Sequence, residues 1–431
     1  AGLAGCEAAS ILTSYGIEVN LYEQKPLAFS AAHHYAGFAE LVCSNSLKAA
    51  RVESASGLLK AEMRLAGSLL LSCADRVAVA AGGALAVDRE AFSHLVTEHI
   101  RSHPHIVVRE GEEKTSLPDG PVIVATGPLT SDALAESISA LTGRGSLSFY
   151  DAAAPIVTFD SIDMERAFFA ARYGRGEDDY INCPMDQAEY EAFHAALISA
   201  EHAVLKDFDK MTVYEGCMPI ETLAARGLDA IRYGPLKPVG LRNPRTGKRP
   251  WAVAQLRAEN AAGSLYNLVG FQTNLKFPEQ QRVFSMLPGL EHAEFVRFGV
   301  MHRNTFLDSP RLLDDRLRLK AELRIRFAGQ MTGVEGYMES AASGLFAGID
   351  LAHELSGRPP LLLSPVTMMG ALLRYVSDTS VTRFQPIGAS MGLLPPPEKH
   401  IRDKQQRYAF LADRALRAMK SALSDETDNN L

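Results

Sequence analysis

The sequence predicts an α/β fold in which a Rossmann-like nucleotide-binding domain is interrupted by an inserted α+β domain. The first observation is a glycine turn, a helix and a short strand within residues 1–23. The second is a strand, a glycine loop and a long helix within residues 323–357. The third is the stretch between them, which has its own helix at 187–201 and strands at 251–256 and 265–271. Because nucleotide-binding patterns lie at both ends of the chain, we interpret the middle as an insertion.

The bulk composition supports two folded units. A chain of 431 residues is too long for one ordinary hydrophobic core. We expect the nucleotide-binding domain to comprise residues 1–175 and, with C-terminal helices, 311–431, and the insertion to comprise 176–310. Runs of roughly 18 apolar residues are lacking, so we expect no membrane span. The cysteine pattern fits a reducing cytoplasm. The five cysteines are widely spaced without a CxxC pair, so we expect neither a disulfide framework nor a metal site.

The opening turn has the features of a dinucleotide-binding motif. Gly2 and Gly5 have the spacing of the last two glycines of GxGxxG, and the strand that follows ends in Glu23. Gly2 permits close approach of a pyrophosphate, Gly5 permits helix–strand packing, and Glu23 can accept from ribose hydroxyls. An acid at that position favours FAD or NAD over a 2′-phosphorylated nucleotide. Such a turn normally follows a buried strand, so we expect that strand and the first glycine to precede the sequence given.

Two further segments are candidates for flavin contacts. The strand 121–127 ends in Thr126 and Gly127, a small-residue turn that flavoproteins with two nucleotide-binding motifs place against the flavin nucleotide. The loop before the long helix supplies the other candidates, which are Gly329, Gly333, Glu335 and Gly336. In that helix Ser340, Gly344 and Gly348 recur at every fourth residue, which predicts a flat face for close packing. The predicted domain is therefore a FAD-binding domain.

Several long peptides carry a family resemblance that covers nearly the whole chain. They are FAELVCSNSL (38–47), AGGALAVDRE (81–90), VIVATGPLT (122–130), FYDAAAPIV (149–157), YINCPM (180–185), EGCMPIE (215–221), GPLKPVGL (234–241), NPRTGKRP (243–250), GFQTNLKFPEQ (270–280), GVMHRNTF (299–306) and FAGQMTGVEGYMESAASG (327–344). Together they resemble the bacterial methylenetetrahydrofolate-dependent tRNA uracil-5-methyltransferases, the TrmFO or small Gid family.

The resemblance implies bound FAD, methylenetetrahydrofolate as one-carbon donor and NAD(P)H as reductant. The implied reaction methylates carbon five of the T-loop uridine, position 54, of tRNA. A sister subfamily modifies a uridine of large-subunit (23S) ribosomal RNA, and this target stays open. No membrane partner is expected, and a monomer is the expected oligomeric state.

This chemistry requires a thiolate, because uracil carbon five becomes nucleophilic only after a nucleophile adds to carbon six. Cys217 lies between Gly216 and Met218-Pro219, and the match of EGCMP to the family makes it the candidate nucleophile. Cys43 lies among small polar residues and is the second candidate, either as the base that removes the carbon-five proton or as a protecting group. We expect the remaining cysteines, Cys6, Cys73 and Cys183, to be structural.

The adjacent residues His302, Arg303 and Asn304 lie where the chain returns to the FAD-binding domain. A histidine ring can stack on a pterin, and an arginine can pair with the folate carboxylate or with RNA phosphate. A solvated loop is the alternative interpretation. We favour a folate site.

Residues 232–257 contain seven Lys and Arg residues and no acid in a chain of net charge −7. The candidate RNA contacts in this stretch are Arg242, Arg245, Lys248 and Arg249. Trp251 and Tyr233 are interleaved and could stack on a base. The basic helix expected near 401–420 is a further candidate for RNA contacts, whereas an ordinary solvated hairpin is the alternative for NPRTGKRP.

Two other functional classes fit parts of the pattern. A flavin oxidoreductase acting on a small molecule would keep the fold, but would leave the acid-free stretch and the EGCMP cysteine unexplained. A non-catalytic RNA-binding protein would explain the basic stretch alone. Methyl transfer to tRNA that depends on the folate would distinguish the methyltransferase from both of these alternatives.

Overall fold

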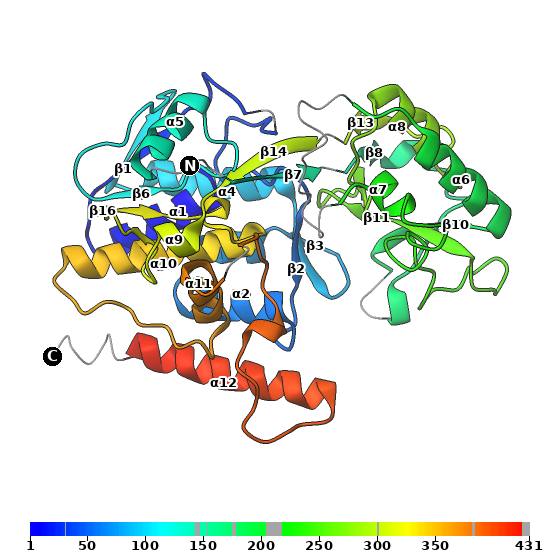
Figure 1. The fold of residues 1–431 in the computed structure, drawn as a ribbon. Coiled ribbons are helices and arrows are strands. Elements are labelled where there is room, and N and C mark those ends of the chain that lie inside the picture. Colours follow the sequence, from blue (N-terminus) through cyan, green and yellow to red (C-terminus); the bar gives the residue numbers. More distant parts are fainter. Residues whose placement is uncertain are drawn as a thin grey trace.

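The computed structural model describes residues 1–30, 32–142, 147–152, 154–174, 178–203, 218–299, 301–381 and 384–424. Figure 1 shows two bodies joined side by side, the larger built from both ends of the chain and the smaller from its middle. Each body has its own hydrophobic core. The predicted class, an α/β nucleotide-binding fold with an α+β insertion, is confirmed.

The first part of the larger body alternates helices and short strands. Its elements are α1 (Leu3–Ser14), β1 (Val19–Glu23), β2 (Ser46–Ala49), α2 (Ala55–Leu65), α3 (Leu69–Arg76), β3 (Ala78–Val79), β4 (Ala84–Val87), α4 (Arg89–Ser102), β5 (Ile106–Glu110), β6 (Val122–Val124), α5 (Asp132–Thr142) and β7 (Leu147–Ala152). Strand β1 pairs with β5 in parallel, and α1 packs between this pair and β6. This order places the first glycine turn at the carboxyl end of the parallel strands, where nucleotides bind.

The middle of the chain folds around a six-stranded sheet of order β13-β8-β12-β11-β10-β9. Its elements are β8 (Ile156–Thr158), β9 (Phe168–Phe169), β10 (Tyr180–Met185), α6 (Gln187–Ser199), α7 (Ile220–Ala224), β11 (Ala252–Ala258), β12 (Leu265–Leu268), α8 (Phe277–Phe284) and β13 (Phe295–Arg297). The expected helix and both expected strands are present, with ends that differ by a few residues. All pairings in this sheet are antiparallel, as an α+β insertion requires.

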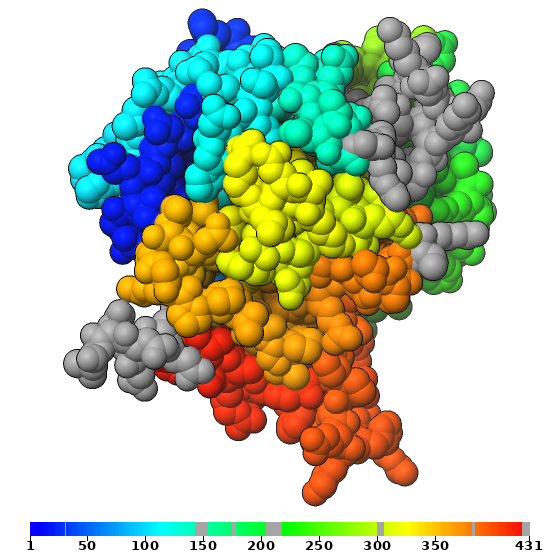
Figure 2. Space-filling model, turned by 60° about the vertical axis from the view of Figure 1, so that its left-hand side comes forward, coloured from blue at the N-terminus to red at the C-terminus, as the bar shows by residue number. Residues whose placement is uncertain are grey.

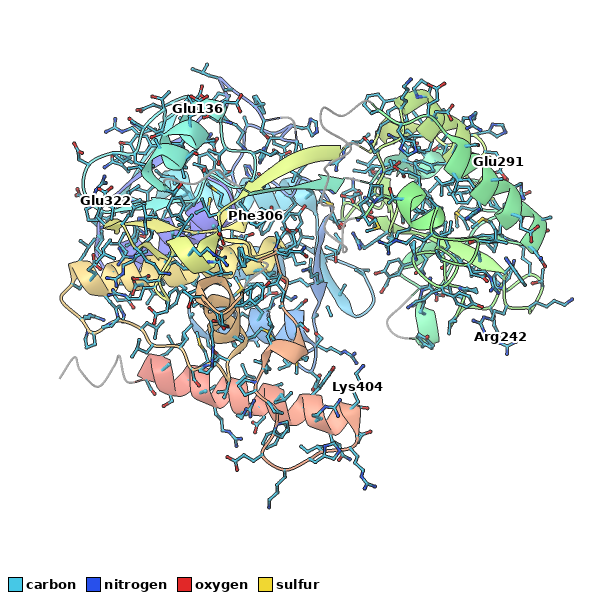
Figure 3. The ribbon with its side chains drawn as sticks, viewed as in Figure 1. Glu136, Arg242, Glu291, Phe306, Glu322 and Lys404 are labelled. Carbon is cyan, nitrogen blue, oxygen red and sulfur yellow. The ribbon has the colours of Figure 1, made fainter. Side chains whose placement is uncertain are left out.

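The second hydrophobic core begins earlier in the chain than the expected boundary. Ala154, Val157, Ile162 and Ala167 pack in it, and the first core resumes at Phe306. Strand β14 (Met301–Phe306) pairs with β7, so the two connections between the bodies run side by side as an antiparallel ribbon. Figure 3 places Phe306 inside the larger body. We therefore move the proposed start of the insertion from residue 176 to near residue 154.

The chain then completes the larger body. The elements are α9 (Ser309–Leu312), β15 (Arg318–Leu319), β16 (Glu322–Phe327), α10 (Tyr337–Leu355), α11 (Met368–Ser377) and α12 (Lys404–Ser424). Strand β16 pairs with β6 in parallel. Figure 2 shows the segment after α10, coloured orange to red, protruding beyond the rest of this body. Within the described ranges, no helix has both the length and the apolarity needed to cross a bilayer.

Close packing of α1 on α10 sets the geometry of the larger body. A Cβ atom at Gly344 would overlap the backbone of Ala4, and one at Gly348 would overlap Ile11. The flat helix face expected from the glycine spacing is therefore used against the first helix. Contact at this distance leaves no room for any larger residue, because protein interiors pack at the density of organic crystals. The loops that precede the two helices are consequently held close to one another.

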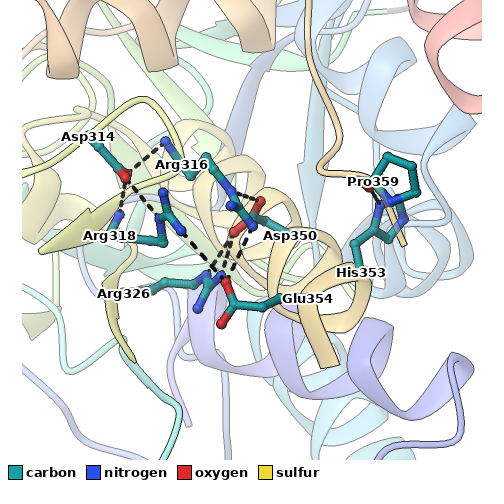
Figure 4. Close-up of polar contacts among 8 residues, drawn as sticks. All are labelled: Asp314, Arg316, Arg318, Arg326, Asp350, His353, Glu354 and Pro359. Atoms are coloured by element: carbon teal, nitrogen blue, oxygen red, sulfur yellow. Dashed lines mark hydrogen bonds and ion pairs between the residues drawn. The ribbon is translucent and has the colours of Figure 1, made fainter. Parts of the chain in front are cut away.

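Buried ionisable side chains hold further elements of the larger body together. Arg326 on β16 and Asp350 on α10 are both fully buried and paired at 2.8 Å, and Glu354 joins them at 2.7 Å (Figure 4). Glu62 on α2 accepts from Met368 N and Met369 N and so caps α11. Burial raises the pKa of Glu62 to about 7. Removing one partner of such a buried pair costs about 3–5 kcal/mol, so these contacts hold the scaffold rigid.

Candidate active site

The N-terminus of α1 lines a cavity of about 130 Å³. Gly2 is the N-cap residue, its φ is −79°, no side chain caps the helix, and no acid lies in the first turn. A Cβ added to Gly2 would meet nothing within 4 Å. Uncapped amide groups and the helix dipole make this end a binding position for a phosphate group. The cavity therefore fits the pyrophosphate of a dinucleotide at the expected turn.

Two other predicted cofactor residues line the same cavity. Glu23, at the end of β1, accepts from Lys25 N at 3.0 Å. Thr126, just after β6, shares a hydrogen bond with Thr130 at 2.7 Å. Gly5 does not line the cavity, and the place of its missing Cβ faces Ala125 and Leu21, as expected for helix–strand packing. Gly127 follows Thr126 with a left-handed φ of +76°.

Several polar residues that line this cavity were not among the candidates predicted from the sequence. His33 lies 2.5 Å from Ser30 Oγ through Nδ1, and burial lowers the pKa of His33. Glu40 accepts from the backbone of His34 and Tyr35 at 2.8 and 3.1 Å. Lys25 is buried and donates to Gly37 O. These residues lie in an irregular segment without a hydrophobic period. The sequence feature that could have indicated a site there is the concentration of titratable side chains after Glu23.

The glycine loop before α10 stands apart from the 130 Å³ cavity, whose lining contains none of its residues. Gly333 has a φ of +84°, and a Cβ there would overlap the Phe384 ring. Gly329 N donates to Ser343 Oγ at 2.7 Å, and Glu335 accepts from Gln330 at 2.6 Å. Gly336 is the N-cap of α10, again without a side-chain cap. The loop thus leads to a second helix N-terminus, beside the segment that carries Cys43, and the Glu339–Lys48 pair lies against Gly336.

The segment Leu41 to Asn45 is held by three arginines. Arg89, the first residue of α4, donates to Leu41 O at 2.7 Å. Arg297 on β13 donates to Val42 O at 2.6 Å. Arg257 on β11 donates to Ser44 Oγ and Asn45 Oδ1 at 2.7 and 3.0 Å. We name these the three clasp arginines, and two of them come from the inserted domain.

Cys43 lies at the centre of this segment and is partly exposed. Its backbone N–H donates to the Tyr337 hydroxyl at 2.6 Å, and Ser44 N–H donates to the same oxygen at 3.1 Å. Burial, and next the Cys43 thiol, raise the pKa of Tyr337, which therefore stays neutral. The thiol is thus placed where α10, α4 and the inserted sheet meet.

The other cysteines of the described ranges are buried. Burial raises the pKa of Cys6 to about 12 and that of Cys73 to about 11, and it also raises the pKa of Cys183. Thiols of this kind are chemically inert at neutral pH. Their structural assignment from the sequence agrees with this burial.

The structure describes the predicted nucleophile and the predicted folate contacts incompletely. Cys217 lies outside the described residues. The backbone of His302, Arg303 and Asn304 belongs to β14, opposite Asp151, Tyr150 and Phe149 of β7. These residues therefore lie on the ribbon that joins the two bodies and not in a loop.

A larger cavity of about 380 Å³ separates the two bodies near the clasp. Its lining includes Arg89, Arg297, Glu259 and Glu40, and Glu40 also lines the first cavity. Arg89 and Glu259 pair at 2.7 Å across the domain boundary and are 5% and 4% exposed. A ligand in this cavity would touch the side chains that position Cys43. No group of three or more potential metal ligands occurs within the described parts of the chain.

Some cations of the basic stretch 232–257 are exposed, whereas others bind groups within the protein. Arg242, Lys248 and Arg249 are exposed on a closed turn, whereas Arg245 donates to Met164 O and Ala167 O at 2.5 and 2.9 Å. Arg257, one of the seven cations of this stretch, is 6% exposed and therefore does not belong to an RNA-facing surface. The guanidinium of Arg232 lies over the Trp251 ring at 3.8 Å and over the Tyr233 ring at 5.2 Å, and Tyr233 remains 70% exposed.

The fold and the site define a dinucleotide-binding α/β protein with an inserted domain and a partly exposed thiol where the two meet. The chain belongs to the glucose inhibited division protein A family, whose model matches residues 1–359. The methylenetetrahydrofolate–tRNA-(uracil-5-)-methyltransferase TrmFO of Acetivibrio thermocellus is 56% identical over 424 residues, 98% of this chain and 97% of that protein.

Other relatives agree with this assignment. The protein of the same name from Listeria innocua is 53% identical over 420 residues, covering 97% of this chain and 96% of its own. The solved structure of Aquifex aeolicus GidA in its form II crystal aligns with a TM-score of 0.70 at 14% identity, over 97% of this chain and 71% of that one. The last comparison shows a shared fold.

The open space at Gly2 gives a test of the first cavity. Gly2→Ala should leave the fold intact, because φ is compatible with alanine and its Cβ meets no atom. The methyl group should instead block the pyrophosphate, lowering the flavin bound per protein at least tenfold, measured by absorbance near 450 nm. Gly83→Ala is the matched control, since its Cβ also meets nothing within 4 Å. Equal flavin content in both variants would place the dinucleotide elsewhere.

Proposed function

We propose that this protein is an enzyme that methylates carbon five of a uridine in transfer RNA, with methylenetetrahydrofolate as the one-carbon donor. The observation that carries the proposal is identity of 52–56% over nearly the full length to relatives named for this reaction. FAD is the redox cofactor and NAD(P)H the reductant. The T-loop uridine is the proposed target, and the cytoplasm is the proposed location.

Gly2, Glu23 and Thr126 are the residues that fit FAD, because they surround the bare N-terminus of α1 in one cavity. When bound, FAD supplies a carrier for the one-carbon unit and a hydride. Glu23 would bind the adenosine ribose, and the amides after Gly2 would bind the pyrophosphate. The second helix N-terminus, at Gly336, is the proposed contact for the flavin end, together with Gly329, Gly333, Glu335 and Gly127.

The proposed chemistry uses two thiols. Uracil carbon five attacks an electrophile only after a thiolate has added to carbon six, and the proton on carbon five must then leave. We assign the addition to Cys217 from its EGCMP sequence and the proton removal to Cys43. The surroundings of Cys43 support a role in chemistry, because it is partly exposed and lies among cationic side chains.

Residues His302, Arg303 and Asn304 are the proposed folate contacts. Their place on β14, in the ribbon between the bodies, supports this assignment because folate must reach both the flavin and the RNA base. Arginine can pair with the glutamate carboxylates of the folate tail, and histidine can stack on its pterin.

The RNA surface is proposed to include the exposed cations of the turn at residues 242–249. Figure 3 shows Arg242 at the outer end of the inserted domain and Lys404 at the start of α12, both directed toward solvent. Arg402, Lys404, Arg417 and Lys420 are exposed on or next to α12. Local positive charge on a chain of net charge −7 is the pattern expected of a protein that binds phosphates at one surface.

Isotope transfer tests the function. Holoprotein, unmodified tRNA, NADPH and methylenetetrahydrofolate with a dideuterated methylene should give 5-methyluridine that carries two deuterium atoms, read by mass spectrometry of nucleosides. Cys217→Ala should keep bound FAD and reduce product formation by at least about 10³-fold, the scale of losing a nucleophile. Methyl transfer from S-adenosylmethionine, or full activity of Cys217→Ala, would contradict the reaction or the assigned nucleophile respectively.

Charge reversal tests the RNA surface. Lys248→Glu with Arg249→Glu should weaken tRNA binding and lower the slope of log K against log salt by about two, one per lost phosphate contact. Arg245 is left intact because it anchors the turn. Arg109→Glu, exposed on β5 of the other body, is the control. An unchanged slope measured by filter binding from 50 to 300 mM salt would remove this turn from the interface.

A further inference from the structure

We propose that Arg297 of the inserted domain is a positioning residue that stabilises the thiolate of Cys43, so that this thiol becomes reactive when the inserted domain is docked. The inference rests on the proposed function, because that reaction needs a second thiol in its charged form. It adds a residue from outside the FAD-binding domain to the chemistry of Cys43.

Geometry provides the first argument. Arg297 Nη2 lies 2.6 Å from Val42 O and 3.4 Å from Cys43 O, so the guanidinium is bound to the backbone of the cysteine itself. The Tyr337 hydroxyl accepts from Cys43 N–H at 2.6 Å on the other side. The peptide groups on both sides of Cys43 are therefore fixed, one by each domain, with the guanidinium next to the backbone that carries the thiol.

The balance of charge provides the second argument. Three cations face the segment from α4, β11 and β13, namely Arg89, Arg257 and Arg297. Four carboxylates line the cavity beside them. Glu259 pairs with Arg89 at 2.7 Å and Glu40 lies 4.0 Å from Lys25 Nζ, whereas Asp88 accepts from Ala91 N–H and Glu90 from the Tyr35 hydroxyl. Tyr337 on α10 is neutral, and on β2 Lys48 pairs with Glu339 of α10 at 2.9 Å. Arg257 and Arg297 donate to the segment that carries Cys43, and nearby cations favour the thiolate.

Burial strengthens the effect of Arg297. Burial and then Arg89 lower the pKa of Arg297, whereas Glu259 and Cys43 raise it. A guanidinium stays charged even so, because its ordinary pKa is above 12. Arg297 is partly buried, and a partly desolvated charge interacts more strongly with a neighbouring group than a solvated one does. Glu259 and, after it, the sulfur of Cys43 are the negative groups that stabilise this guanidinium.

The contrast with the other thiols makes the inference specific. Cys6, Cys73 and Cys183 are buried without an adjacent arginine contact of this kind, and burial raises their pKa values. Cys43 alone among the cysteines of the described ranges combines partial exposure with a guanidinium on its own peptide group. Selective alkylation of this residue can therefore be measured in the intact protein.

The test measures the pH dependence of Cys43 alkylation in holoprotein that carries Cys217→Ala. Iodoacetamide labelling from pH 5 to 10 is followed by peptide mass spectrometry. Arg297→Gln should raise the midpoint by at least about one pH unit, which slows labelling at pH 7 about tenfold. Arg297→Lys should restore most of the shift, because the positive charge is kept. Arg282→Gln, an exposed arginine on α8 of the same domain, should leave the midpoint unchanged.

Bound FAD and thermal unfolding are recorded for each variant, so that a structural role is separated from the electrostatic one. An unchanged midpoint in folded, flavin-bound Arg297→Gln would overturn the proposal. If Arg297→Gln does not fold, Arg297→Met takes its place, and an unchanged midpoint in that folded, flavin-bound variant would overturn the proposal equally. Methyl transfer by the unmodified protein is measured in parallel, and its absence would contradict the proposed function without affecting the result for the thiol.

Discussion

The segment from Leu41 to Asn45 runs between the two hydrophobic cores, and the three clasp arginines hold it there. Arg257 and Arg89 are almost fully buried, so they are stable only while their hydrogen bonds and the Arg89–Glu259 pair are intact. Separation of the two bodies would leave these charges unpaired at a newly exposed surface. The contacts that fix the relative position of the two domains therefore also fix the position of Cys43.

Close packing of α1 on α10 supplies the other half of the site. Gly344 and Gly348 bring the two helices into backbone contact, and each helix begins without a side-chain cap. The N-terminus of α1, which has no acid in its first turn, favours a negatively charged group of a cofactor. Tyr337, the first residue of α10, links that helix to Cys43 through its hydroxyl. The cofactor scaffold and the thiol are thus coupled by a single side chain.

Local sequence patterns were sufficient to predict the cofactor-binding turn at α1 and the close packing face of α10. The turn at Gly2, the acid at Glu23 and the glycine spacing of α10 each express a contact between neighbouring residues or along one helix face. The start of the inserted domain was misplaced because β8 and β9 have three and two residues, too short for an alternating pattern. Burial of Arg257 could not be predicted, because a buried arginine within a strand has the same sequence signature as an exposed one.

The clasp itself could not be derived from sequence. Its hydrogen bonds join Leu41 to Arg89, Ser44 to Arg257 and Val42 to Arg297, which are 48, 213 and 255 positions apart. Such partners become visible only when the fold brings them together. The same holds for His33 and Glu40, whose place beside the first cavity depends on the path of an irregular segment.

Hydrogen–deuterium exchange of the peptide that contains Cys43 and Ser44 tests most directly whether both domains hold this segment. Arg257→Gln removes the bonds to Ser44 and Asn45 from the inserted side, and Arg282→Gln on α8 serves as the matched control. The account predicts faster exchange of this peptide in Arg257→Gln, with protection in both hydrophobic cores retained. Exchange of this peptide at the unmodified rate in Arg257→Gln would contradict it.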